Sequence, residues 1–241
     1  MEQRARNSKR IVKILVLAAI LILPGFLYYL LEREGKNSYK PLPIYGEKAL
    51  TGTFTSRMGE KIPDTAFHLV PEGNFINQLG NETIIPGQDT SISIVNFFYT
   101  RCESFCQHMN DEMDRVAVRF SNNPKVQFFT FTVDTAYDRP EVLAEYARKY
   151  SPETKKWNFL TGSGDDVLEY ARKGWMVDAV QDTAREAAFI HSSSLILMDS
   201  KRRIRGYYDV NQLKEVDRLI DEIKLLLVEE VRNRDLTIGV K

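Results

Sequence analysis

Two cysteines, Cys102 and Cys106, are the residues of this 241-residue chain whose type and spacing most directly indicate chemistry. An apolar run at residues 91–99 precedes them, and a helical pattern over residues 105–120 follows. A cysteine at the start of a helix lies close to unpaired backbone N–H groups and to the positive end of the helix dipole, and both favour the thiolate over the thiol. The thiolate is the form that binds metals and attacks disulfides, so we expect the pair to be reactive.

The spacing of the cysteines, with three residues between them, helps to distinguish a metal site from a disulfide. Three intervening residues put the two sulfurs about one helical turn apart on one face. A disulfide needs sulfurs about 2.05 Å apart, which this spacing reaches only with local adjustment, whereas a metal bound at about 2.3 Å per sulfur keeps them further apart. A purely structural disulfide closes a loop of about five residues and adds only ~2 kcal/mol. The spacing therefore favours a metal site, with a redox pair or a structural disulfide as alternatives.

A third ligand would come from one of three histidines, His68, His108 and His191. His108 follows Cys106 by two residues, so on a helix it points about 200° away from the cysteine face. His68 lies before the core strand with no argument that places it near the cysteines, and His191 directly precedes an expected strand at residues 193–198. The residues alone leave the third ligand open. Two thiolates and an imidazole form a soft set that suits copper(I) or copper(II), and no fourth Cys or His is obvious for a structural zinc.

The elements that would position the cysteines follow an α/β pattern. Apolar runs rich in β-branched and aromatic residues predict strands at residues 91–99, 126–133, 157–160, 193–198 and 204–208. Apolar residues three and four positions apart predict helices at residues 105–120, 139–150 and 165–173, and a last helix with apolar positions from 213 to 231. Helices between strands imply a mixed, mostly parallel sheet with helices on both faces. Residues 177–188 match neither pattern.

One helix start has a candidate cap. Asp138 precedes the expected helix at residues 139–150, and Glu141 follows it by three residues, as in a capping box. Because an aspartate side chain can accept hydrogen bonds from the unpaired N–H groups of the first turn, we expect Asp138 to be the N-cap.

The first residues have the character of a membrane anchor. Basic residues precede an uncharged apolar stretch at residues 14–31, whose 18 residues would cover about 27 Å as a helix, close to the hydrocarbon thickness of a bilayer. We expect residues 1–13 to stay in the cytoplasm and the rest to lie outside it, on the periplasmic side of a bacterial inner membrane. A cleaved signal peptide is the alternative, but bulky residues stand where its cleavage site would be.

The remaining chain divides into a polar linker at residues 32–51, one globular domain at residues 52–234 and a short tail at residues 235–241. A chain of this length is sufficient for a single α/β domain with a full core. Lys+Arg and Asp+Glu both number 33, so the formal net charge is zero. A nucleic-acid binder would show a strong basic excess, so that class is not indicated.

Several motifs taken together resemble the Sco/SenC family of copper proteins, which assist assembly of cytochrome c oxidase. The resemblance covers roughly residues 62–231 and rests on the order and spacing of four segments. They are Asn96-Phe-Phe-Tyr-Thr100 before the C-x-x-x-C pair, Thr132-Val-Asp134 followed by Asp138-Arg-Pro140, Trp157-Asn-Phe-Leu-Thr-Gly162, and His191-Ser192 followed by Leu-Ile-Leu-Met-Asp199. The chain departs from the family pattern at Glu103 and Gln107, where a proline commonly follows each cysteine.

This resemblance implies a thioredoxin-like fold, with a mixed central sheet flanked by helices, on an N-terminal transmembrane helix. It implies that Cys102, Cys106 and His191 bind copper, as Cu(I) or Cu(II), in a metallochaperone. The implied partner is the copper-receiving subunit of cytochrome c oxidase or another thiol or copper protein. Asp134 matches a family aspartate and would support the copper ligands or dock the partner. The carboxylate of Glu103 would raise the pKa of a neighbouring thiol, so copper affinity or potential would differ from that of typical members.

Two other functions stay open at this point. The first is an extracytoplasmic thiol–disulfide oxidoreductase that keeps a partner's cysteines reduced, in which one of Cys102 and Cys106 attacks and the other resolves. The second is a membrane-tethered redox or copper sensor, although the sequence offers no signalling module. A metallochaperone needs no catalytic acid or base, because copper can pass between soft ligands by ligand exchange.

Overall fold

The computed structural model describes residues 13, 16–30, 41–57, 60–87, 91–103, 105–150, 156–181 and 189–238. The chain forms two compact units, Met1–Lys40 and Pro41–Lys241. In the first unit, the described residues 16–30 are helical. Within the described part of the chain, no helix combines the length and the apolar character needed to cross a membrane. Residues 14, 15 and 31 of the expected anchor at residues 14–31 lie outside the described part.

The second unit is built on a seven-stranded sheet in the order β11-β10-β5-β6-β7-β3-β4. Its strands are β3 (Gly73–Asn77), β4 (Glu82–Ile85), β5 (Ile92–Phe98), β6 (Val126–Thr132), β7 (Trp157–Thr161), β10 (Ser194–Met198) and β11 (Ile204–Asp209). The pairs β5–β6 and β6–β7 are parallel, and the other four neighbouring pairs are antiparallel. The sheet is mixed, as predicted. The expectation that it is mostly parallel was wrong, because two antiparallel hairpins, β3–β4 and β10–β11, flank the parallel centre.

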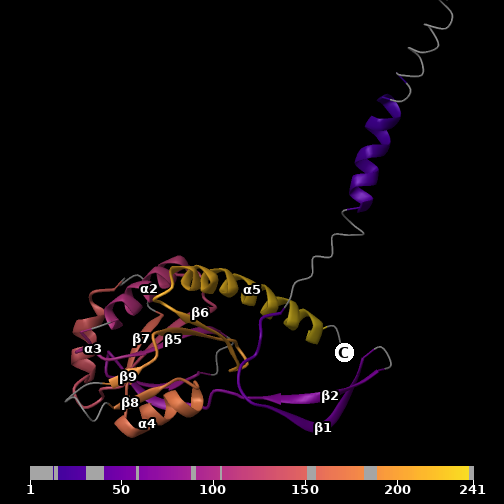
Figure 1. Ribbon diagram of the computed structural model, residues 1–241. Coiled ribbons are helices and arrows are strands. Elements are labelled where there is room, and N and C mark those ends of the chain that lie inside the picture. The colour runs from indigo at the N-terminus through magenta and orange to yellow at the C-terminus, as the bar shows by residue number, and fades with distance from the viewer. Residues whose placement is uncertain are drawn as a thin grey trace, which may run out of the picture. The chain divides into compact units, whose positions relative to one another are not determined.

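Helices cover both faces of this sheet, as predicted (Figure 1). On one face lie α2 (Cys106–Arg119), α3 (Pro140–Ala147) and α5 (Leu213–Ile238), and on the other lie α4 (Gly164–Glu169) and the π-helical η1 (Tyr170–Gly174). The strand β5 is buried on both faces, because Ile94 packs in the core beneath α2 and Val95 packs in the core beneath α4. The strand that leads to the cysteines is therefore fixed from both sides.

The strands and the first helix predicted around the cysteines are confirmed. The predicted bounds of β5, β6, β7, β10, β11 and α2 agree with the observed ones to within one residue. The apolar face expected on α2 is buried from Met109 to Phe120. On α5, Val216 is buried as expected, whereas Leu213 and Val231 are more than half exposed. The expected C-terminal tail begins inside α5, which continues to Ile238.

Six strands were not predicted from the sequence. They are β3, β4, β1 (Lys48–Arg57), β2 (Glu60–Phe67), β8 (Ala179–Gln181) and β9 (Phe189–His191). The pairs β1–β2 and β8–β9 each form a separate two-stranded sheet. These segments lack a continuous apolar run, and β8 and β9 have only three residues each. Within the segment that matched neither pattern, residues 182–188 lie outside the described part.

The expected linker at residues 32–51 is partly built into the domain. Leu42 is 8% exposed, and β1 begins at Lys48. The guanidinium of Arg205 in β11 donates hydrogen bonds to the carbonyl oxygens of Leu42 at 2.8 Å and Pro43 at 3.1 Å. Because these backbone groups are paired inside the fold, the compact unit includes the second half of the expected linker.

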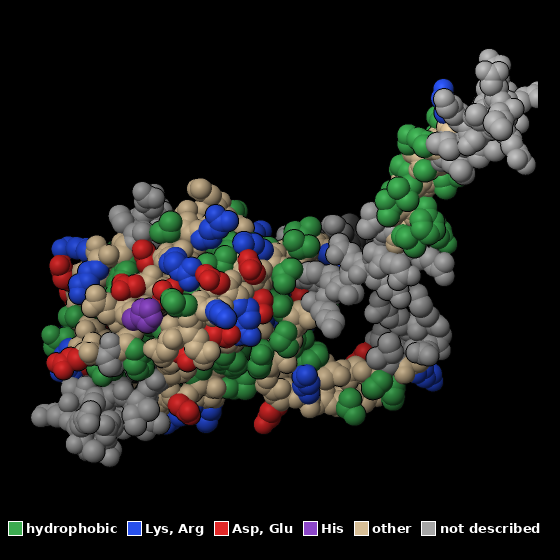
Figure 2. All heavy atoms as spheres, turned by 45° about the horizontal axis from the view of Figure 1, so that its top comes forward, with side chains coloured by type: hydrophobic (Ala, Val, Ile, Leu, Met, Phe, Trp, Pro, Cys, Tyr) green, Lys and Arg blue, Asp and Glu red, His purple; other side chains and the backbone are tan. Residues whose placement is uncertain are grey.

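Charged side chains of both signs are interspersed over the face of the second unit shown in Figure 2. This agrees with the formal net charge of zero. On the described part of that face, the mixture does not form the single-sign field that attracts a polyanion.

Candidate metal centre

The two cysteines lie in the connection from β5 to α2. Because β5 ends at Phe98 and α2 begins at Cys106, Cys102 lies in the connecting loop and only Cys106 is helical. The expectation of two helical cysteines one turn apart was therefore wrong. The backbone N–H of Cys102 donates instead to the carbonyl oxygen of Tyr99 at 3.3 Å, so the loop turns directly after the strand. No disulfide joins the two cysteines.

The two cysteines differ in exposure, and the buried one has a raised pKa. Cys106 is 1% exposed, whereas Cys102 is only partly buried. A hydrogen bond with the Cys102 side chain raises the pKa of the Cys106 thiol, and burial raises it further, while a backbone hydrogen bond with Tyr99 lowers it. Cys106 is therefore held as a thiol, contrary to the expectation for a cysteine at a helix start. The hydrogen bond with Cys102 and the burial of the sulfur both act against the thiolate of Cys106.

Two aspartates from the turn after β6 fix the start of the cysteine loop. Asp138 is fully buried and accepts hydrogen bonds from the backbone N–H of Thr100 at 2.9 Å and from two threonine hydroxyls. Asp134 is 4% exposed and pairs with the guanidinium of Arg101 at 2.5 Å. Because Thr100 and Arg101 immediately precede Cys102, these contacts hold the loop against the end of β6.

Arg101 makes a second contact with the same turn. Its guanidinium carbon lies 4.2 Å from the centroid of the Tyr137 ring, a cation–π arrangement. The hydrogen bond with Asp134 raises the pKa of Arg101. Any support that Asp134 gives to the site would act through Arg101, the residue next to Cys102.

The expected capping role of Asp138 was wrong. The N-cap of α3 is Arg139, which makes no side-chain capping hydrogen bond, and a proline occupies the first turn. Proline has no N–H, so the helix start has one donor fewer to satisfy. The carboxylate of Asp138 turns inward, where Thr100 and Thr132 supply three donors.

The buried carboxyl of Asp138 predicts a pH dependence of stability. Burial raises its pKa above the ordinary value, and hydrogen bonds from Thr100 and Thr132 only partly oppose this. A carboxyl whose pKa is raised by folding stabilises the native state as the pH falls through the folded pKa, and the gain is complete below the unfolded pKa of about 3.9. We expect the wild type to gain stability relative to Asp138→Asn on acidification, measured by urea unfolding at each pH. A difference that stays constant or shrinks would contradict this.

The backbone of His191 lies at the same edge of the sheet as the cysteines. His191 ends β9, and β10 begins three residues later at Ser194. Since β10 runs antiparallel to β5, with Ile196 opposite Val95, the chain enters β10 at the edge where β5 leaves the sheet toward Cys102. A parallel neighbour would have put the start of β10 at the opposite edge. The side chain of His191 lies outside the described part.

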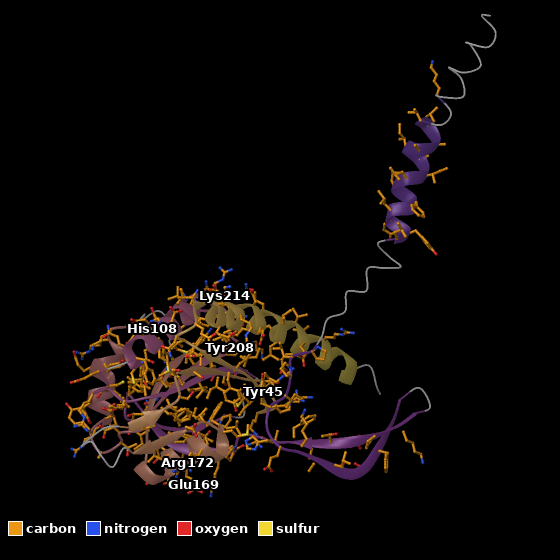
Figure 3. The ribbon with its side chains drawn as sticks, viewed as in Figure 1. Tyr45, His108, Glu169, Arg172, Tyr208 and Lys214 are labelled. Atoms are coloured by element: carbon orange, nitrogen blue, oxygen red, sulfur yellow. The ribbon has the colours of Figure 1, made fainter. Side chains whose placement is uncertain are left out.

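The other two histidines bond to backbone carbonyls. His108 Nε2 lies 3.1 Å from the carbonyl oxygen of Val210, and Figure 3 shows His108 on α2 near Lys214 at the start of α5. His68 Nε2 lies 2.8 Å from the carbonyl oxygen of Gly174. One ring nitrogen of each histidine is therefore engaged with a segment other than the cysteine loop.

The adjacent thiols form a soft donor pair that fits copper(I). Among the side chains that the structure describes, no group of three His, Cys, Asp or Glu is placed to hold a metal ion. The side chain of His191 is not among them. The full set of two cysteines and His191 stays a prediction.

Sequence reasoning assigned no role to Arg101, Asn96 and Asn110, which lie in the strand, loop and helix that carry the cysteines. No sequence signal identifies Arg101, because its partner Asp134 is 33 positions away. The two asparagines have a visible signal. Each is a polar residue at a position where the strand pattern or the helix face calls for an apolar one.

A parallel β5–β6–β7 centre, antiparallel flanking hairpins, helices on both faces and a cysteine pair after β5 define a thioredoxin-like protein. The chain belongs to the SCO1/SenC family, whose model matches residues 64–227.

The comparisons with individual proteins agree with this family. The SCO1 protein homolog of Bacillus subtilis is 27% identical over 168 residues, which cover 69% of this chain and 86% of that protein. BsSco is a member of the Sco family of cytochrome c oxidase assembly proteins and has a disulfide switch. Its structure aligns with this chain at a TM-score of 0.57 and 26% identity, and the alignment covers 65% of this chain and 92% of the BsSco chain. A SCO1/SenC family lipoprotein of Bacillus anthracis shares the fold, with a TM-score of 0.61 and 23% identity. The alignment covers 66% of this chain and 95% of the lipoprotein chain. Yeast Sco1 and Arabidopsis thaliana ScoI, which share the fold at TM-scores of 0.53 and 0.55, have been crystallised with copper bound.

Proposed function

We propose that this chain is a copper-binding metallochaperone that assists assembly of the copper site of cytochrome c oxidase. The observation that carries the proposal is the pair of adjacent reduced thiols after β5, with the backbone of His191 at the same edge of the sheet. Membership of the SCO1/SenC family supports it. So do the copper-bound structures of the yeast and Arabidopsis relatives and the oxidase-assembly family to which BsSco belongs.

Copper is the cargo in this proposal, and Cys102, Cys106 and His191 are its ligands. Cys102 is partly exposed, so an incoming copper ion or partner reaches it first. Cys106 lies beneath and loses its proton when both sulfurs bind the metal. Copper then passes to the soft ligands of the receiving subunit by ligand exchange. Glu103 and Gln107 are both exposed, and solvent therefore weakens the effect of the Glu103 carboxylate on the thiols.

We also propose that residues 14–31 anchor the chain in a membrane, with residues 1–13 in the cytoplasm and the domain on the periplasmic side. The support is the row of basic residues before an uncharged apolar stretch. The Bacillus anthracis relative is a lipoprotein, a class of protein held at membranes by covalent lipid. A domain outside the cytoplasm would meet its oxidase partner beside the membrane.

Copper titration of the full chain, purified in detergent, reduced and kept anaerobic, tests the proposed ligands. We expect the wild type to bind about one copper ion, and each of Cys102→Ser and Cys106→Ser to lose binding, because two soft thiolates supply most of the affinity for copper(I). His191→Ala should weaken binding by at least about 100-fold, since even residues that only orient a ligand are worth 10–100-fold.

The matched control is His108→Ala, whose ring bonds to a carbonyl oxygen near α5, and this variant should keep the wild-type affinity. Undiminished affinity in His191→Ala would remove His191 from the site. Copper retained by both cysteine variants would overturn the proposal.

A second function, thiol–disulfide exchange, is favoured by the unequal exposure of two hydrogen-bonded thiols. The accessible Cys102 thiolate would attack a partner disulfide, which forms a mixed disulfide and releases one partner thiol. Cys106 would then attack the Cys102 sulfur and release the second partner thiol, so that two electrons pass to the partner. The disulfide switch of BsSco supports this candidate. Both functions use the reduced pair and are compatible.

A further inference from the structure

A buried polar contact joins the two elements that carry the cysteines. Asn96 lies in β5 two residues before its end, and Asn110 lies on α2 one turn after Cys106. Both asparagine side chains are fully buried, and Asn96 Nδ2 donates a hydrogen bond to Asn110 Oδ1 at 2.8 Å. The neighbours of both residues on these faces of the strand and the helix are apolar core side chains.

Further hydrogen bonds connect Asn110 to two tyrosines nearer the surface. Asn110 Nδ2 donates to the hydroxyl oxygen of Tyr146 at 3.1 Å, and the Tyr150 hydroxyl donates to the same oxygen at 3.2 Å. The Tyr146 ring lines a hollow of about 450 Å³ beside Thr100 and Arg101. At the inner end, Asn96 Oδ1 is buried without a hydrogen-bond partner in the described part of the chain.

Core packing alone does not account for these asparagines. Apolar side chains of similar volume would avoid the cost of a buried oxygen atom that has lost its hydration. A hydrogen bond differs from apolar packing because it has a restricted length and direction. The Asn96–Asn110 bond therefore restricts the position of α2 against β5 more closely than apolar packing does. Since Cys102 follows β5 and Cys106 begins α2, the same bond restricts the separation of the two sulfurs.

We propose that Asn96 and Asn110 are positioning residues that hold the cysteine pair in its reduced spacing and oppose closure of the Cys102–Cys106 disulfide. Closure brings the sulfurs to about 2.05 Å. Asp134 and Asp138 hold Arg101 and Thr100 directly before Cys102, so closure draws the start of α2 toward the loop, and that movement distorts the bond between the asparagines. The inference rests on the proposed function only in taking the two thiols as the reacting pair.

The test is the equilibrium of the full chain with glutathione, in which the two thiols reduce one oxidised glutathione to two glutathione molecules and form the Cys102–Cys106 disulfide. In the double variant Asn96→Leu/Asn110→Leu, which removes both polar partners together, we expect the disulfide to be favoured by about tenfold. For a two-electron couple this is a shift of about 30 mV toward lower potential. Tyr146→Phe removes only the outer partner of Asn110 and should shift the equilibrium less, in the same direction.

The matched control is Asn77→Ala. Asn77 is also buried, and its Oδ1 accepts hydrogen bonds from the backbone N–H groups of Leu79 and Asn81 in the turn between β3 and β4. This variant should lose stability without changing the thiol equilibrium. An unchanged equilibrium in both the double variant and Tyr146→Phe, or a shift toward the dithiol, would overturn the proposal. The readout needs no copper, so a failure of the copper proposal would leave this test intact.

Discussion

In the reduced protein at neutral pH, iodoacetamide should modify Cys102 at least about 100 times faster than Cys106, because the thiolate is the reacting species. Cys106 is 1% exposed, and its pKa is raised by the hydrogen bond with the Cys102 side chain and by burial. Cys102 lies in the loop before α2 and is partly exposed. Peptide mapping by mass spectrometry at successive times measures both rates.

Two variations separate the causes of this difference. Unfolding in guanidinium removes both burial and the hydrogen bond, so the two rates should become similar. In Cys102→Ser the sulfur partner is lost while burial stays, and Cys106 should react faster than in the wild type but still slowly. Similar rates for both cysteines in the folded wild type would contradict the assignment of Cys102 as the accessible thiol. The order matters for function, because a partner would meet Cys102 first in either proposed reaction.

Arg205→Ala should lower the free energy of unfolding by about 3–5 kcal/mol, the usual cost of removing one partner from a buried ion pair. Arg205 is 1% exposed and pairs with Asp199 at 3.0 Å and with Glu229 at 2.9 Å. It also donates to the carbonyl oxygens of Leu42 and Pro43. The substitution leaves the fully buried Asp199 with one cation fewer and leaves both carbonyls without this donor. Urea unfolding measures the change.

Arg115 provides the matched control for Arg205. Its side chain is 43% exposed and pairs with Glu112 and Asp217 on the surface, where ion pairs are worth about 0–1 kcal/mol. Arg115→Ala should therefore cost no more than about 1 kcal/mol. A loss for Arg205→Ala no larger than that for Arg115→Ala would contradict this prediction. The ion pairs and hydrogen bonds of Arg205 would then contribute little to holding the segment at Leu42 against β11 and α5.

Local sequence patterns determined the elements around the cysteines. The strands β5 and β6 are seven-residue runs of mostly β-branched and aromatic residues, and α2 places its apolar side chains on one face. Such patterns depend only on residues close in the chain, so the sequence reveals them. The motif order likewise identified the family, which the match over residues 64–227 confirms.

Contacts between distant residues decided the rest. The antiparallel pairing of β10 with β5 placed the backbone of His191 at the cysteine edge. Three threonine donors turned Asp138 inward, although the local pattern predicted a helix cap. The burial of Cys106 against Cys102 reversed the acidity expected from its place at a helix start.

The chemistry of the two cysteines, which have three residues between them, depends on both local and tertiary structure. The sequence alone determined that the pair follows a core strand and precedes a helix, because hydrophobic periodicity is a local property. Only the tertiary structure decided that Cys102 is the accessible thiol and that the pKa of the Cys106 thiol is raised, because burial and hydrogen bonding depend on segments brought together by folding. Desolvation acts at full strength only inside the packed core, so no spacing rule could predict it.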